Sequence, residues 1–302
     1  MSATLSRGDW ARALLVITIW GLNFVVMKWG VATLSPLLLC ALRFMAASLP
    51  FLLFVRPPRN LRWSVIAAYG VVQGVGQFGL LLSAMKVGMP AGMASVVLQT
   101  QAFITMLLAA VLLGEKPQRW QWLGLCIAIG GLLFIGMAHG DSPADMPLLG
   151  FVLVVGAAAM WAGSNLLTRL AAQQGAYDAV AFIVWSSLFS ILPLLGLSLW
   201  LEGGPHAVLQ QLQGIGWREL AVVGYLAFLS TLVGYGLWTR LLQRYAASTV
   251  APLSLIVPVV GLLSAMLLLG ERPSPWQWLG TLGVLAGMCI NQFGGRWARR
   301  RD

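Results

Sequence analysis

Polar and aromatic side chains recur at one-turn spacing inside otherwise apolar stretches of this chain. Residues three or four apart lie on the same face of a helix. The pairs are Trp20 with Asn23, Gln73 with Gln77, Ser95 with Gln99, Trp161 with Asn165, and Ser254 with Pro258. Any single pair is equally well explained by a hydrogen bond between helices, which contributes about 0.6 kcal/mol in lipid. The set as a whole favours a central polar cavity.

Arg43 places a permanent charge about two turns into an apolar stretch. A mid-helix arginine costs roughly 2.5–3.5 kcal/mol on membrane-insertion scales, so its presence requires a reason. Contact with an anionic solute group and capping of carbonyl oxygens on a neighbouring helix are equally good interpretations. Lys28, by contrast, is near the end of its stretch, and its long side chain is expected to reach the membrane surface.

Carboxylates and imidazoles do not occur well inside any apolar stretch. Proton relays in pumps are usually built from such groups, so the sequence favours a facilitator or exchanger over a carboxylate-based proton antiporter. Glu115 and Glu271 stand at the ends of stretches, where we expect them to cap helices or pin loops. The sequence has no HExxH, GxSxG or Asp-rich motif, and its three cysteines lack metal-ligand spacing. Neither an enzyme nor a cofactor is therefore predicted.

Membrane helices must position these residues. Hydrophobic residues make up 59% of the 302 residues and charged residues only 9%, which is outside the usual range of soluble globular domains. A helix needs about 20 mostly apolar residues to cross the hydrocarbon core. We predict an all-α membrane protein with ten transmembrane helices, at residues 11–31, 36–55, 64–84, 91–113, 120–138, 147–170, 179–200, 219–240, 248–269 and 275–294.

The chain contains an internal repeat. Residues 112–124 (LLGEKPQRWQWLG) return as residues 268–280 (LLGERPSPWQWLG), with ten of thirteen positions identical. A fainter match relates Trp20–Lys28 to Trp161–Arg169. Five predicted spans separate the copies, so the two halves should lie in the bilayer upside down relative to each other. We predict a 5+5 inverted repeat with halves at residues 1–140 and 141–302.

The formal net charge of +10 reflects membrane topology rather than nucleic-acid binding. With a cytoplasmic N-terminus, 14 of the 19 Lys and Arg residues fall in cytoplasmic segments and only 3 in external ones. This bias follows the positive-inside rule and predicts that both termini are cytoplasmic. No nucleic-acid partner is predicted, because the basic residues are not gathered on one face.

Proline and glycine suggest where helices bend or pack closely. Pro90, Pro252 and Pro258 are candidate bends at corresponding places in the two halves, and freed carbonyl groups there require a cavity. The GxxxG pairs Gly70/Gly74 and Gly283/Gly287 indicate close helix packing, with homodimer contact as the alternative interpretation.

Several segments resemble the drug/metabolite transporter superfamily, EamA type. They are Trp20–Lys28, Leu42–Met45, Gly88–Phe103, Tyr225–Phe228 with Val233–Gly236, and Ala251–Gly261. The resemblance implies ten helices in an inverted repeat, around a central cavity lined by spans one, three, four, six, eight and nine. It further implies export of cysteine and O-acetylserine type amino-acid metabolites through the bacterial inner membrane.

Such a zwitterionic substrate needs partners for both of its charges. Arg43 or helix N-terminal donors could meet the carboxylate. The ammonium would need carbonyl groups freed near Pro252 and Pro258, amide oxygens of Asn or Gln, or the faces of Trp20, Trp161, Tyr235 or Trp238. The alternatives are a broad-specificity exporter of the same fold and a purely structural membrane protein, which would not need paired polar faces.

Overall fold

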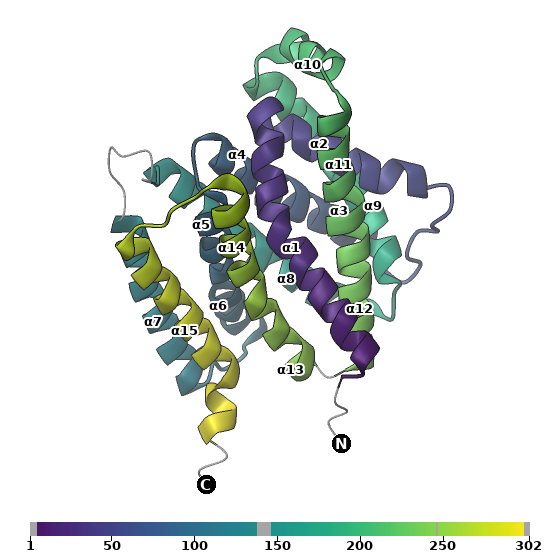
Figure 1. The fold of residues 1–302 in the computed structure, drawn as a ribbon. Coiled ribbons are helices and arrows are strands. Elements are labelled where there is room, and N and C mark those ends of the chain that lie inside the picture. Colours follow the sequence, from purple (N-terminus) through teal and green to yellow (C-terminus); the bar gives the residue numbers. More distant parts are fainter. Residues whose placement is uncertain (1–4, 138–145, 246, 299–302) are drawn as a thin grey trace.

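The computed structural model describes residues 5–137, 146–245 and 247–298, and these residues form helices joined by short turns and loops (Figure 1). The first group of helices is α1 (Arg7–Thr33), α2 (Pro36–Ser48), η1 (Leu49–Phe51), α3 (Trp63–Gly70), η2 (Val71–Gly79), α4 (Leu80–Lys86), α5 (Ala91–Val97), η3 (Leu98–Thr100), α6 (Gln101–Leu113) and α7 (Arg119–Met137). The second is α8 (Leu148–Gln174), α9 (Ala179–Leu201), α10 (Gly204–Gln213), α11 (Trp217–Gly224), η4 (Tyr225–Val233), α12 (Gly234–Arg244), α13 (Ala247–Val250), η5 (Ala251–Ile256), α14 (Val257–Leu269) and α15 (Pro275–Ala298).

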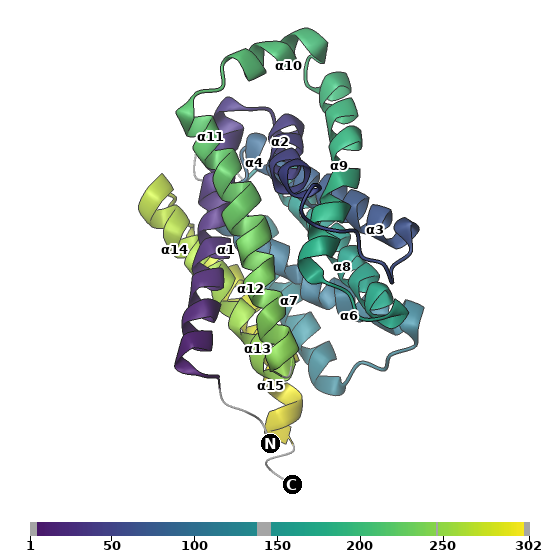
Figure 2. The same ribbon diagram turned by 90° about the vertical axis from the view of Figure 1, so that its right-hand side faces the viewer.

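The long helices form one bundle with two distinct ends. Helix α1 begins and α15 ends at the same end of the bundle, which we call the terminal end (Figures 1 and 2). Helix α10 lies across the opposite end, which we call the α10 end. This arrangement agrees with an even number of crossings. The predicted boundary between residues 140 and 141, and Arg299, Arg300 and Arg301 of the charge count, lie outside the described residues.

Eight helical stretches among the described residues are long and apolar enough to cross a membrane. The second predicted span is shorter than expected, because its apolar helix covers only Pro36–Phe51 rather than residues 36–55. Because Pro50 lacks a backbone N–H, it cannot continue the α-helical hydrogen bonds, and the helix ends in the short 3₁₀ segment η1. Helix α15 has 24 residues but is not among the eight. The count of ten spans therefore remains a prediction.

Irregular helical turns recur at matching places in the two halves. The middle of the third predicted span is the π-helical segment η2 (Val71–Gly79), and the eighth contains the π-helical segment η4 (Tyr225–Val233). The fourth and ninth spans contain the 3₁₀ segments η3 (Leu98–Thr100) and η5 (Ala251–Ile256). The π segments are 9 residues long in both halves. The repeat seen in the sequence therefore extends to local backbone geometry.

The fourth and ninth spans meet near the α10 end. The hydroxyl of Ser95 in α5 donates to the carbonyl oxygen of Pro258 in α14 at 3.3 Å. A Cβ atom at Gly261 would approach the Cβ of Ser95 to 2.8 Å, so the crossing requires a residue without a side chain here. Toward the terminal end the spans have different neighbours, since α6 packs against α8 and α13 against α12.

Helices α7 and α15 form a closely packed pair at one side of the bundle (Figure 1). A Cβ atom at Gly287 would lie 2.5 Å from the carbonyl oxygen of Gly124, and one at Gly283 would lie 2.9 Å from the Cα of Gly131. In the other GxxxG pair, Gly70 and Gly74 face Ser186 and Ser190 of α9. Both pairs are therefore used for close packing within the chain.

Candidate functional site

A cavity of about 1010 Å³ lies in the centre of the bundle. It is bordered by residues of α1, α2, the third and fourth predicted spans, α8, α9, the eighth span, and the ninth. Ten of the twelve residues predicted for the site line it: Trp20, Asn23, Arg43, Gln77, Gln99, Trp161, Asn165, Tyr235, Trp238 and Ser254. The periodic polar faces of separate spans thus converge on one space.

Gln73 and Pro258 are not in the wall of this cavity. The Nε2 of Gln73 donates to the hydroxyl of Tyr235 at 3.0 Å, so Gln73 stands behind a wall residue. The carbonyl oxygen of Pro258 accepts from Ser95, which itself lines the cavity. Gln73 and Pro258 therefore support wall residues, and neither lines the cavity as predicted. Residues four positions apart share a helix face, but they differ in depth along the helix, so only Gln77 and Ser254 of these pairs reach the cavity wall.

Arg43 is fully buried and is tied to the eighth predicted span by hydrogen bonds. Its Nε and Nη2 donate to the hydroxyl of Thr231 at 3.1 and 3.0 Å, and Nη2 also donates to the hydroxyl of Ser230 at 3.4 Å. Its guanidinium lies 3.9 Å from the ring centroid of Phe78. Among the described residues no carboxylate lies within 4.0 Å of it. Arg43 therefore binds side-chain hydroxyls of a neighbouring helix rather than its carbonyl oxygens, which the capping interpretation had expected.

Several polar atoms of the cavity region are buried without a hydrogen-bond partner. They include Nη1 of Arg43, Oδ1 of Asn23 and Oε1 of Gln77. Asn23 and Gln77 lie on α1 and η2, and all three residues line the cavity. Buried polar groups in folded proteins are nearly always paired, so unpaired ones need an explanation. Together these atoms comprise one charged donor and two acceptors, all covered by neighbouring atoms in this conformation.

A second polar group occupies the side of the cavity formed by α6 and α8. The Nδ2 of Asn165 donates to Oε1 of Gln101 at 2.8 Å and to the hydroxyl of Thr105 at 3.1 Å. Gln101 and Thr105 line the cavity, as do Tyr69 and Thr168, but none was predicted. Their four-residue spacing, Gln101 to Thr105, is the signal that would have found the first two.

Aromatic rings form part of the wall between α1 and α12. The ring of Trp20 lies with its centroid 5.3 Å from that of Tyr235 and 5.4 Å from that of Trp238. The indole Nε1 of Trp20 donates to the carbonyl oxygen of Ser230 at 3.1 Å, inside the π-helical segment η4. The ring of Trp20 is thus held in place by a backbone carbonyl group of η4.

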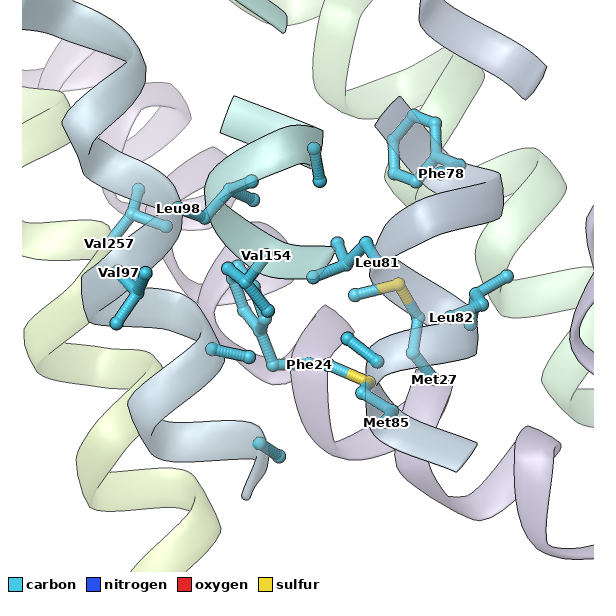
Figure 3. Close-up of a cluster of buried hydrophobic side chains, with 14 of the residues drawn as sticks. Phe24, Met27, Phe78, Leu81, Leu82, Met85, Val97, Leu98, Val154 and Val257 are labelled. Carbon is cyan, nitrogen blue, oxygen red and sulfur yellow. The ribbon is translucent and has the colours of Figure 1, made fainter. Parts of the chain in front are cut away.

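Apolar side chains line the cavity on the side of the α10 end. They belong to a larger cluster of buried hydrophobic residues, part of which is drawn in Figure 3. Phe24, Leu81, Leu98 and Val257 belong both to this cluster and to the cavity wall. Met27, Met85, Val97 and Val154 of the same cluster are at most 1% exposed. We call these eight residues the apolar seal.

Side-chain hydrogen bonds to the backbone reinforce the bundle on the α10 side of the seal. The Nζ of Lys28 donates to the carbonyl oxygens of Met85 and Met89 at 3.0 and 2.9 Å. The first of these carbonyl groups is in the last turn of α4 and the second is in the loop after it, so the Lys28 side chain ends close to the α4–α5 loop. The expectation that Lys28 reaches the membrane surface stays a prediction. The carboxylate of Glu271 accepts from the backbone N–H groups of Ala91 and Gly92 at 2.6 and 2.9 Å. The expectation that Glu271 caps a helix is confirmed.

The cavity reaches the surface at the terminal end. The exposed residues Arg169, Ala172 and Ala176 lie in its wall. Arg169 forms an ion pair with Glu115, with Nη1 2.8 Å from Oε1, and the two side chains are 46% and 55% exposed. Glu115 therefore pins the loop between α6 and α7 to α8 at the cavity mouth.

A charged cluster at the start of α1 was not predicted. The carboxylate of Asp9 accepts from the hydroxyls of Ser6 and Tyr245 at 2.7 Å and lies 3.1 Å from Nη1 of Arg244. It joins α1 to the end of α12. No group of three or more potential metal ligands occurs among the described residues.

A multi-pass helical bundle with a polar cavity that opens at one end and is sealed at the other has the architecture of a solute transporter. The EamA-like transporter family matches residues 10–137 and 148–292 of this chain, so the chain belongs to that family. The two matched segments correspond to two copies of one repeat.

Named relatives agree with this class. The chain is 44% identical over 296 residues to a "Probable amino-acid metabolite efflux pump" of Salmonella typhimurium, and 41% identical over 296 residues to one of the same name from Escherichia coli, with 98% of each chain covered. It is 29% identical to a "Probable terminal-alkyne amino-acid exporter" of Streptantibioticus cattleyicolor, over 95% of this chain and 94% of that one. These names indicate a transporter rather than an enzyme.

The fold has a counterpart among solved structures. One crystal structure has a TM-score of 0.57 with 18% sequence identity and covers 96% of this chain and 100% of its own. At this identity the likeness concerns the fold alone.

Proposed function

We propose that this protein exports small amino-acid metabolites, of the cysteine and O-acetylserine type, from the cytoplasm through the bacterial inner membrane. It does so by alternating access around the central cavity. Ten spans in a 5+5 inverted repeat, with both termini cytoplasmic, provide the framework. The positive-inside bias supports this topology and makes the terminal end the cytoplasmic face. The cavity mouth at Arg169 and Ala176 then receives substrate from the cytoplasm.

The observation that carries the proposal is the set of unpaired polar atoms in the cavity region. Nη1 of Arg43 is a charged donor without an acceptor, and Oδ1 of Asn23 and Oε1 of Gln77 are acceptors without donors. A zwitterionic amino acid offers a carboxylate and an ammonium, which are the complementary groups. A charge-assisted hydrogen bond is roughly twice as strong as a neutral one, so such a ligand would satisfy these atoms once they turn toward the cavity. In this conformation neighbouring atoms cover all three.

The electrostatic balance of the cavity supports a carboxylate-bearing substrate. Arg43 has no carboxylate within 4.0 Å among the described residues, and a buried unpaired cation attracts an anionic group strongly. The ammonium of the same substrate meets neutral amide oxygens and the rings of Trp20, Tyr235 and Trp238, whose faces favour cations. Neutral partners hold it weakly, which suits release on the far side.

Efflux of labelled cysteine and O-acetylserine from proteoliposomes tests the proposal. We expect efflux down the substrate gradient both with and without a pH gradient, since the described part of the cavity wall contains no carboxylate or imidazole. Asn23→Leu and Gln77→Leu should reduce efflux. If neither amino acid is transported by a correctly inserted protein, the proposal is wrong.

The volume of the cavity favours one alternative, a broad-specificity drug/metabolite exporter of the same fold. A space of about 1010 Å³ is at the upper end of the 300–1,000 Å³ typical of sites for drug-sized ligands. Transport of cationic dyes by the same proteoliposomes, with cysteine failing to compete, would favour the alternative.

A further inference from the structure

The two copies of the repeated segment have the same backbone but different side-chain partners. Gly114 and Gly270 end α6 and α14 with φ of 68° in both cases. The next residues, Glu115 and Glu271, donate from their backbone N–H groups to the carbonyl oxygens of Ala109 and Ala265, each at 3.3 Å. The two glutamates therefore start from the same geometry. Their carboxylates nevertheless have partners of different kinds.

Glu271 connects the two halves at the closed side of the cavity. Its two carboxylate oxygens accept from the N–H groups of Ala91 and Gly92, the first two residues of α5. The first N–H groups of a helix lack intrahelical acceptors, and a carboxylate there is favoured by the helix dipole as well. A Cβ atom at Gly92 would meet Leu262 at 2.8 Å and Oε2 of Glu271 at 3.2 Å, so α5 and α14 are tightly packed around this contact.

Glu115 does not cap a helix in this conformation but pairs with Arg169 at the open mouth. The internal repeat identifies the helix start that is equivalent, for Glu115, to the start of α5 that Glu271 caps. Glu271 follows Glu115 by 156 positions, and the same step carries Ala91 and Gly92 onto Ala247 and Ser248. These residues open α13, and α13, η5 and α14 together end at Leu269, 156 positions after the end of α6. The fourth and ninth predicted spans therefore start 156 positions apart and also end 156 positions apart.

The bases beside the two glutamates correspond as well. Lys28 and Arg169 occupy equivalent places in the weaker repeat of Trp20–Lys28 and Trp161–Arg169. Arg169 is ion-paired with Glu115, whereas Lys28 donates to the carbonyl oxygens of Met85 and Met89. The Glu271 carboxylate is nevertheless close enough to the Lys28 ammonium for the two charges to attract each other. Glu115 is thus paired with its neighbouring base, whereas Glu271 accepts hydrogen bonds from the start of α5.

We propose that Glu115 and Glu271 are reciprocal latches that exchange these two kinds of partner during transport. When the cavity closes at the terminal end, Glu115 leaves Arg169 and accepts from the N–H groups of Ala247 and Ser248. Glu271 then leaves Ala91 and Gly92 and pairs with Lys28, and the α10 end opens. This inference rests on the proposed alternating access, because two inverted halves that exchange conformations interchange their equivalent contacts.

Cysteine accessibility in the full-length protein tests the exchange without any substrate. In a chain whose Cys40, Cys126 and Cys289 are replaced by serine, Val97→Cys places a reporter in the apolar seal, where it is buried here. The probe is a membrane-impermeant maleimide added from the α10 side. We expect Glu271→Gln to raise the labelling rate about tenfold, because it weakens a hydrogen bond to a charged group. Glu115→Gln should lower the labelling rate or leave it unchanged.

Glu202→Gln is the matched control for loss of a carboxylate cap at the same end. Glu202 accepts from the N–H groups of Leu37 and Leu38 at the start of α2, but it is not part of the repeated segment. Its variant should leave the labelling of the Val97→Cys reporter within about twofold of the parent. Equal responses of the Glu271 and Glu115 variants, or a control response equal to that of the Glu271 variant, would overturn the proposal.

A crosslink provides a second measurement if Glu271→Gln is poorly folded. The pair Glu115→Cys and Ser248→Cys should react with a short bismaleimide in the cysteine-free background. Failure to crosslink in a correctly inserted protein would also overturn the proposal. Because these assays need no transported solute, failure of the latches is distinguishable from an incorrect substrate.

Discussion

Gln73 and Tyr235 connect the two π-helical regions of the molecule by one hydrogen bond. The Nε2 of Gln73, in η2, donates at 3.0 Å to the hydroxyl of Tyr235, which follows η4 by two residues. A π-helical turn disrupts the regular hydrogen-bond ladder and often occurs at functional sites. Here the hydrogen bond crosses from one half of the chain to the other and fixes the ring of Tyr235 in the cavity wall.

We expect Tyr235→Phe to lower the free energy of unfolding by about 1–3 kcal/mol, because it leaves the buried amide of Gln73 without a partner. Thermal unfolding in detergent measures this loss. The double variant Tyr235→Phe/Gln73→Leu should recover part of it, since both polar partners are then removed together. Additive losses in the double variant would contradict the coupling.

Arg43→Lys should impair export nearly as strongly as Arg43→Ala, although it keeps the positive charge. An ammonium cannot reproduce the planar fork that contacts Ser230 and Thr231 while lying on the ring of Phe78. We expect both variants to insert normally. The measurement is cysteine efflux at matched expression, and full activity of either variant would remove Arg43 from the site.

Asn23→Leu and Gln77→Leu should raise the KM for cysteine by roughly tenfold, the effect of losing one hydrogen bond to a charged group. Substrate-dependent efflux rates from proteoliposomes provide the KM. Thr168→Val, in the same cavity wall but donating to the carbonyl oxygen of Ser164, is the control and should change it little. An unchanged KM in both amide variants would exclude the two amide oxygens as partners of the ammonium.

Gly131→Leu should destabilise the protein by about 1–3 kcal/mol through overpacking. The side chain would collide with the backbone of Gly280 and Val284 in α15. Gly130→Leu is the matched control, because no atom lies within 4 Å of a Cβ at that neighbouring position. Thermal unfolding of the two variants separates the effects, and similar melting temperatures would argue against the close packing of α7 with α15.

Part of the site could be predicted because a membrane helix makes buried polar residues conspicuous. Asn23, Gln77 and Asn165 stand out in apolar surroundings, and their one-turn spacing to a second polar or aromatic residue indicated a common direction. Gln101 was missed because it stands two residues after Gln99, which a regular α-helix would place on nearly the opposite face. The 3₁₀ segment Leu98–Thr100 interrupts that periodicity, and both side chains line the cavity.

Other features depend on groups that the local sequence does not specify. Asp9 is buried at the start of α1, and its partners Arg244 and Tyr245 lie more than two hundred positions away in the sequence. The early end of the second span depends on Pro50, whose effect on a membrane helix varies with the groups around it. The two carbonyl acceptors of Lys28 likewise depend on where α4 ends.

The apolar seal also bears on what else passes through the protein. Its eight side chains are hydrocarbon and thioether, and they offer water no hydrogen-bonding partner (Figure 3). We therefore expect that no continuous file of water molecules connects the two compartments while the cavity mouth at the terminal end is open. Such a barrier would let a cell discharge a metabolite while retaining its protonmotive force.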